Sequence, residues 1–160
     1  MTETATQPTI LHNTFVVERS YPATPERVFA AFADAAQKRE WFAGGPGTEI
    51  TEYALDFRVG GNEIARFRPL TGPHSDTVFC ARSNYQFIDA NKRIVMANTM
   101  SKGEQCISAA LVSFELLPTA AGTDLICTHQ AAFFEGADGP EIRKMGWNSL
   151  LDKLGKALEA

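Results

Sequence analysis

Several patterns that would point directly to a partner are missing from this chain. There is no block of Lys and Arg, and the net charge is −4, which argues against nucleic acid or an anionic membrane surface as the main partner. No run of about 18 apolar residues occurs, so the sequence predicts no transmembrane helix and no membrane partner. The N-terminus lacks a basic region followed by an apolar stretch, so we expect no signal peptide.

The motifs of common metal, nucleotide and hydrolase sites are missing as well. The three cysteines form no Cys-x-x-C pair, and His12, His74 and His129 lie far apart in the sequence, so we expect no metal site. The glycine-rich stretch 44–47 lacks the following Lys-Ser/Thr of a phosphate-binding loop, and there is no Gly-x-Ser-x-Gly motif. We therefore predict no cofactor, and buried, reduced cysteines in a cytoplasmic protein.

Apolar and aromatic residues, in contrast, are plentiful. The chain has 160 residues, of which 44% are hydrophobic and 11 are phenylalanine. This is enough for one domain with an aromatic-rich interior. Residues 1–8 are small and polar and are expected to form a disordered tail, so the single domain is expected to span residues 9–160.

A long helix is predicted over residues 138–158. Asp138 and Glu141 have the spacing of a capping box, and Pro140 suits a first helical turn. A stripe at helical spacing then indicates the face that packs on the rest of the chain: Trp147, Leu150, Leu151, Leu154 and Leu158.

The first half of this helix has a second, offset face made of Ile142, Met145 and Gly146. A helix that is apolar over a wider arc at its start is expected to be more enclosed there. We therefore predict that this half forms the roof of a cavity and faces His129.

The remaining chain is predicted to form one strand, two short helices and six further strands. A strand is indicated at 14–21 by β-branched and aromatic residues. Thr24 as an N-cap and Pro25 at the first helical position start one helix. Asp34 with Gln37 forms a capping box that starts the next. Short turns separate the predicted later strands, at 50–57, 63–67, 78–88, 93–100, 107–117 and 124–133.

Short connections favour antiparallel neighbours. The predicted fold class is therefore α+β, with a curved antiparallel sheet in the order β-α-α-β-β-β-β-β-β-α wrapped around the long C-terminal helix. Whether the space between sheet and helix is filled or hollow decides what such a domain can do.

Three segments resemble a known family. Residues 21–29 resemble its first strand and helix start, Asp56-Phe57-Arg58-Val59-Gly60-Gly61 resembles its Asp-x-Arg-x-Gly-Gly turn, and residues 146–154 resemble its terminal helix. Thr128-His129 also fits. Over residues 12–158 the chain resembles the START-like (SRPBCC, helix-grip) superfamily, and specifically its AHSA-like branch, named for the heat-shock ATPase activators. The resemblance implies the helix-grip fold, but the superfamily includes lipid binders, cyclases and stress proteins, so it implies no single activity.

The chain departs from the family after the Gly-Gly turn, where large apolar residues usually alternate and Asn62-Glu63-Ile64-Ala65-Arg66-Phe67 stands instead. Glu63 shares strand parity with Phe67, so it either replaces an apolar cavity residue or the register differs and it lies exposed on the other face. A buried carboxylate would have its pKa raised unless a cation pairs with it.

His129 shares a strand face with Leu125 and Cys127, so it is predicted to face the interior. There an imidazole can act as a general acid or base. The alternative, which we favour, is a structural or ligand-orienting histidine. A Glu63–His129 pair would be an acid–base dyad and would imply an enzyme.

Aromatic and soft side chains are predicted to line the interior. Packed tightly they form plain core, whereas around a void they form a pocket for a hydrophobic ligand. The residues are Trp41, Phe57, Phe67, Phe79, Met96, Phe114, His129, Phe133, Met145 and Trp147.

Three functions follow as hypotheses. The preferred one is binding of a small hydrophobic molecule between the sheet and the last helix. The second is a cyclase, lyase or hydrolase that acts on such a molecule through His129 and Glu63. The third, which the resemblance implies, is a module that interacts with a chaperone ATPase. The sequence leaves open whether the chain forms a homodimer.

Overall fold

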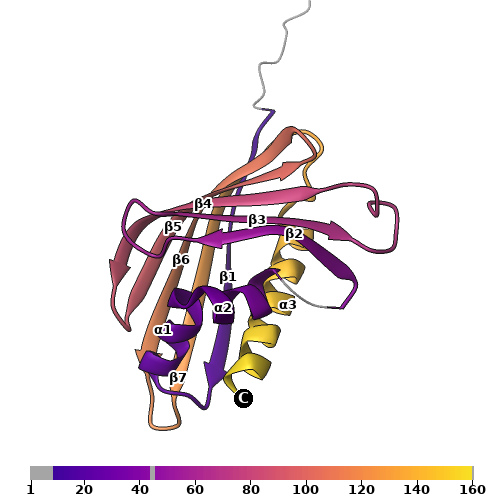
Figure 1. The fold of residues 1–160 in the computed structure, drawn as a ribbon. Coiled ribbons are helices and arrows are strands. Elements are labelled where there is room, and N and C mark those ends of the chain that lie inside the picture. The colour runs from indigo at the N-terminus through magenta and orange to yellow at the C-terminus, as the bar shows by residue number, and fades with distance from the viewer. Residues whose placement is uncertain (1–8, 44–45, 160) are drawn as a thin grey trace, which may run out of the picture.

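The computed structural model describes residues 9–43 and 46–159, so the predicted tail at 1–8 and part of the glycine-rich stretch lie outside the described residues. Seven antiparallel strands form one sheet, in the order β1-β7-β6-β5-β4-β3-β2. Figure 1 shows the helices together on one side of this curved sheet, and we call that side the inner face. The strands are β1 (Leu11–Tyr21), β2 (Thr48–Leu55), β3 (Asn62–Pro69), β4 (Phe79–Asp89), β5 (Arg93–Lys102), β6 (Gln105–Pro118) and β7 (Thr123–Phe133).

The predicted α+β helix-grip fold is confirmed, and the strands end within a few residues of the predicted bounds. Each strand from β2 to β7 pairs with its neighbour in sequence, as short turns require. The first strand instead returns to the last, because β1 pairs with β7 over its full length. The first and last strands thereby lie side by side, and β1 forms the edge of the sheet against which α3 packs.

The two short helices start as predicted. Helix α1 (Pro25–Ala33) is capped by Thr24, whose Oγ1 accepts a hydrogen bond from the backbone N–H of Arg27 at 3.2 Å. Helix α2 (Ala35–Lys38) is capped by Asp34, whose Oδ1 accepts from the N–H of Gln37 at 3.0 Å. A π-helical turn, η1 (Arg39–Ala43), follows directly and brings its aromatic residues under the sheet.

The C-terminal helix α3 (Pro140–Leu158) does not start as predicted. Gly139, with φ of 87°, occupies the N-cap position, and no side chain caps the helix there. Asp138 binds Arg143 instead, accepting from its Nε at 2.9 Å and from its Nη2 at 2.8 Å. The expected capping box is therefore wrong, because a two-bond pairing with a guanidinium takes up the Asp138 carboxylate.

The predicted roof of the cavity is wrong as well. Ile142 is 60% exposed and Met145 69% exposed, and Gly146 is also exposed. Arg143 instead occupies the buried position one helical turn before Trp147, and its guanidinium carbon lies 5.2 Å from the centre of the Phe133 ring. The buried stripe of α3 thus has a charged residue at its start, which a search for apolar spacing does not detect.

Polar contacts fix α3 against β1. The Tyr21 hydroxyl donates to the backbone oxygen of Leu151 at 2.7 Å, and Arg19 donates to Asn148 Oδ1 at 2.7 Å and to Asp152 Oδ1 at 3.0 Å. Around these contacts one apolar core joins sheet, α1, η1 and α3.

The Asp-x-Arg-x-Gly-Gly turn has a structural role that its residues explain. Gly60 adopts a φ of 84°, which favours glycine. A Cβ on Gly61 would collide with the backbone oxygen of Asp56. The turn is tied to β4 by two backbone hydrogen bonds at Tyr85, of 2.8 and 3.0 Å. It thereby sets the position of Tyr85 beside Glu63 on β3.

The three cysteines are free. Cys80 and Cys127 are buried as predicted, whereas Cys106 is exposed, so the expectation of buried thiols is wrong for that residue.

Candidate functional site

One cross-strand row of the inner face is made of short or polar side chains. The strand register places its members side by side from β3 to β1. We call it the inner row, and it consists of Glu63, Ser83, Asn98, Ala110, Ala131 and Asn13.

The inner row is less tightly covered than the row beside it. Asn98 and Ala110 are each 9% exposed and Ala131 is 7% exposed, although they lie mid-sheet beneath the helices. In the adjacent row, Met96 and Val112 are 0% exposed. Short side chains that remain partly exposed in the middle of a sheet leave room above them.

Side chains from α3 and η1 cover the flanks of the inner row. The Trp147 ring lies 5.6 Å from Phe114 and 6.1 Å from Phe42, measured between ring centres. One turn earlier, Arg143 Nη2 donates to Ser108 Oγ at 3.0 Å. Trp147 and Arg143 therefore contact the sheet on opposite sides of the row, and the region between these contacts is the candidate site.

At the β1 end of the inner row, two buried polar atoms lack a hydrogen-bond partner within the described part of the chain. They are Nδ1 of His129 and Oδ1 of Asn13. His129 is 1% exposed and stacks on Phe15 with 4.5 Å between ring centres. Leaving such an atom unpaired costs roughly 1–3 kcal/mol, so both atoms call for a partner, either an ordered water or a polar group of a bound molecule.

The prediction that His129 faces the interior is confirmed. Burial, and after it the positive charge of Arg143, lowers the pKa of His129 from 6.5 to about 4, while Asp138 opposes the shift. The imidazole is therefore neutral at pH 7 and offers hydrogen bonds rather than charge.

At the β3 end, Glu63 is buried in a fully bonded polar cluster. Its Oε1 accepts from Lys38 Nζ at 3.1 Å and from the Tyr85 hydroxyl at 2.9 Å, and its Oε2 accepts from the Tyr53 hydroxyl at 2.6 Å. The Lys38 ammonium also lies 4.4 Å from the centre of the Phe42 ring. We call Glu63, Lys38, Tyr53 and Tyr85 the Glu63 cluster.

The surroundings of Glu63 explain how β3 departs from the family pattern. Glu63 is 2% exposed, so it replaces an apolar interior residue and the register is as expected. Burial, followed by the charge of Glu63, raises the pKa of Tyr53 and of Tyr85, so both hydroxyls stay protonated and donate. Lys38 was not predicted as the partner of Glu63, because its position depends on how α2 packs under the sheet.

The structure does not form the Glu63–His129 pair that would have implied an enzyme. Glu63 is on β3 and His129 on β7, with β4, β5 and β6 between them. Four strand spacings amount to roughly 19 Å along the sheet. The Glu63 oxygens are moreover already bonded to the other members of their own cluster.

The residues predicted to line the interior divide into three groups. Trp41, Met96, Phe114, Phe133 and Trp147 are buried in the main core, with His129 beside them. Phe57, Phe67 and Phe79 are half-buried, and the last two stack on each other with ring centres 5.8 Å apart. Met145 lies at the surface. The short members of the inner row were missed, since the hydrophobic pattern gives no signal for small residues.

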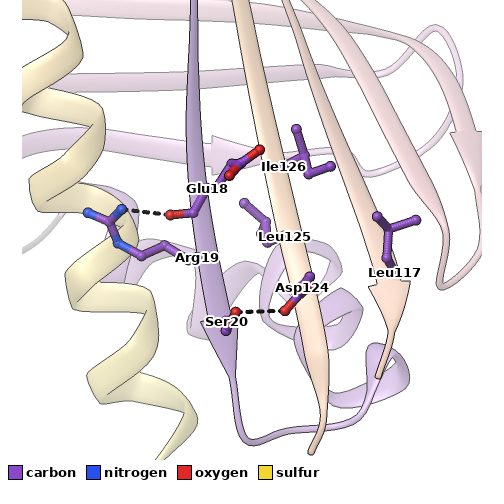
Figure 2. Close-up of a pocket in the computed structure, with 7 residues that line it drawn as sticks. All are labelled: Glu18, Arg19, Ser20, Leu117, Asp124, Leu125 and Ile126. Carbon is purple, nitrogen blue, oxygen red and sulfur yellow. Dashed lines mark hydrogen bonds between the residues drawn. The ribbon is translucent and has the colours of Figure 1, made fainter. Parts of the chain in front are cut away.

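Two surface pockets lie away from the inner row. Figure 2 shows the first, of about 210 Å³, where β1, β7 and β6 run side by side, with Ser20 donating to Asp124 Oδ1 at 2.6 Å. The second, of about 300 Å³, lies between residues 22–26 and 118–122. Neither is lined by one of the unpaired buried atoms found in the described residues, so the inner row remains the candidate.

None of the helices that the structure describes is long and apolar enough to cross a membrane. Within residues 9–43 and 46–159, no three His, Cys, Asp or Glu side chains gather as metal ligands.

Comparison with known proteins places the chain among relatives of the same fold. Residues 22–159 match the family model described as Activator of Hsp90 ATPase homolog 1-like protein. The crystal structure of the Mll3558 protein from Rhizobium loti is 39% identical with a TM-score of 0.82, over 94% of this chain and 99% of that one.

A protein from Rhizobium leguminosarum is 33% identical with a TM-score of 0.86, over 94% of this chain and 96% of that one. An AHSA1-like protein from Aeromonas hydrophila is similar in fold, at 18% identity with a TM-score of 0.66 over 92% of each chain. None of the curated proteins matches the chain.

Proposed function

The chain belongs to the family of Activator of Hsp90 ATPase homolog 1-like proteins, and we propose that it binds a small, mostly apolar molecule above the inner row, between the sheet and α3. The fold of this family commonly serves to bind small molecules. The observation that supports the proposal most is the incomplete cover of Asn98, Ala110 and Ala131 in the middle of the sheet.

The composition of the space indicates what it accepts. Ala110 and Ala131 form its floor beside the polar Asn98, and Met96, Phe133 and Trp147 belong to the core that surrounds it, so most of the contact surface is apolar with one amide at its margin. Because Ala110 is only 9% exposed, a ligand gains access only when side chains of the cover move. We therefore propose a small ligand, for example a molecule with a single aromatic ring.

The two other hypotheses have less support. The enzyme hypothesis combined His129 with Glu63, but Glu63 is bonded to Lys38 and three strands separate it from His129. The family name points to the Hsp90 ATPase as an alternative partner, but the unpaired polar atoms inside the fold favour a small molecule. We also propose a cytoplasmic location, where free cysteines persist.

Replacing Ala110 with leucine should block binding. The larger side chain fills the space above the inner row, so the dissociation constant of 1,4-dimethylbenzene should rise at least about tenfold. Ala109→Leu is the matched control, because Ala109 precedes Ala110 on β6 and faces the other side of the sheet. Titration of the ¹⁵N-labelled protein, followed by amide chemical shifts, measures both constants.

Stability of the same two variants gives an independent check. If there is room above Ala110, leucine is accepted with little change in the free energy of unfolding. If the space is already filled, the leucine would overpack the core and lower the free energy of unfolding by roughly 1–3 kcal/mol. Equal binding by both variants, together with such a loss for Ala110→Leu, would refute the proposed site.

A further inference from the structure

We infer that the molecule bound above the inner row has a hydroxyl group, which His129 and Asn13 hold at the β1 end of the site. This inference rests on the proposed function and adds the chemical class of the ligand. It is based on the two unpaired buried atoms, whose residues lie on the neighbouring strands β1 and β7 at one end of the inner row.

The two atoms are close in the sheet. Asn13 pairs with Ala131 and Phe15 pairs with His129 in the β1–β7 register. Asn13 and His129 are therefore diagonal neighbours on the same face, which places their Cβ atoms roughly 7 Å apart or less. A single polar group between them can reach both.

The donors and acceptors at this end fit a hydroxyl. Asn13 Oδ1 is an acceptor and needs a donor. In the neutral tautomer with hydrogen on Nδ1, His129 donates and needs an acceptor. A hydroxyl donates its hydrogen to Asn13 Oδ1, and its oxygen accepts a hydrogen bond from His129 Nδ1–H. Both buried atoms then have a partner. This pairing requires the Nδ1–H form of the imidazole.

Other ligand groups fit less well. A methyl group leaves both atoms unpaired. A carboxylate cannot donate to Asn13, and it brings a charge into a buried site. The nearby cation does not offset that charge, because the Arg143 guanidinium already makes two hydrogen bonds to the Asp138 carboxylate. A water molecule would satisfy the same two atoms, and a ligand hydroxyl reproduces the bonds of such a water.

Three single-ring probes of one shape test the inference: 4-methylphenol, 1,4-dimethylbenzene and 4-methylbenzoate. Leaving the two atoms unpaired costs enough that 4-methylphenol should bind about tenfold more tightly than 1,4-dimethylbenzene, with 4-methylbenzoate weakest. The dissociation constants come from amide shift titrations. The ¹⁵N signal of His129 Nδ1 should move with 4-methylphenol and stay in place with 1,4-dimethylbenzene.

Variants assign the preference to its residues. In His129→Phe the first two probes should bind equally, with the affinity for 1,4-dimethylbenzene unchanged, and Asn13→Leu should have the same effect from the other strand. His74→Phe is the matched control, because His74 is exposed, and it should keep the preference.

The outcomes separate the inference from the proposed function. Equal binding of 4-methylphenol and 1,4-dimethylbenzene by the unaltered protein overturns the hydroxyl and leaves the apolar site standing. If 4-methylbenzoate binds most tightly of the three probes, the inference of a hydroxyl is wrong, and Arg143 recognises a carboxylate instead. If none of the three probes binds, the proposed function itself is wrong, and the inference with it.

Discussion

Replacing Glu63 with alanine should lower the free energy of unfolding by about 3–5 kcal/mol, as expected when one partner of a buried ion pair is removed. Lys38, which is 1% exposed, would keep a charge in the interior with no anion beside it. The hydroxyls of Tyr53 and Tyr85 would lose their acceptor as well. Urea denaturation at pH 7 measures the loss.

A surface pair on neighbouring strands provides the matched control. Arg66 Nε donates to Glu52 Oε1 at 2.7 Å, but the two side chains are 36% and 49% exposed. Glu52→Ala should therefore cost no more than about 1 kcal/mol. The double variant Lys38→Met with Glu63→Leu should regain part of the loss, because it removes both buried charges while the Tyr53 and Tyr85 hydroxyls still lack their acceptor. The account of the Glu63 cluster fails if Glu63→Ala and Glu52→Ala cost the same.

Acidification should destabilise the protein through His129. Its pKa is about 4 in the folded chain, against 6.5 for an ordinary histidine. Between these two values the unfolded state binds a proton that the folded state does not, so stability falls as the pH falls through this window. The full contribution is present above pH 6.5, and its loss reaches about 3 kcal/mol near pH 4.

The variant His129→Phe isolates this contribution from that of the carboxylates. The difference in unfolding free energy between the unaltered protein and the variant should change by about 3 kcal/mol between pH 7 and pH 4. At pH 7 the variant should be at least as stable, because it removes an unpaired buried nitrogen. His74→Phe, at an exposed position, should leave the pH dependence unaltered. A difference that does not vary with pH would show that His129 titrates alike in both states.

The sequence predicted the parts of the fold that depend on local chemistry. Thr24 and Asp34 cap their helices because the atoms they bind lie three residues away. The strands follow from β-branched residues and from turns whose length favours antiparallel neighbours. At Asp138 the same reasoning failed, since Arg143, five residues on, takes the carboxylate.

The candidate site was predictable only in part. Period-two parity placed His129 and Glu63 on the inner face, because parity depends on one strand alone. The partner of Glu63 depends on how α2 packs, and Lys38 lies 25 residues away in sequence. The inner row depends on the register of six strands at once, so Ala110 and Ala131 become neighbours only in the folded sheet.

The most direct test of the central claim is the location of a bound probe. An isotope-filtered NOE spectrum of ¹³C-labelled protein with unlabelled 1,4-dimethylbenzene reports which protein methyl groups lie near the probe. The account predicts NOEs from the probe to the methyl groups of Ala110 and Ala131. The account would be contradicted if the NOEs went instead to Ala109 and Ala132 on the other face of the sheet. NOEs to Leu117 and Ile126 of the surface pocket would contradict it equally.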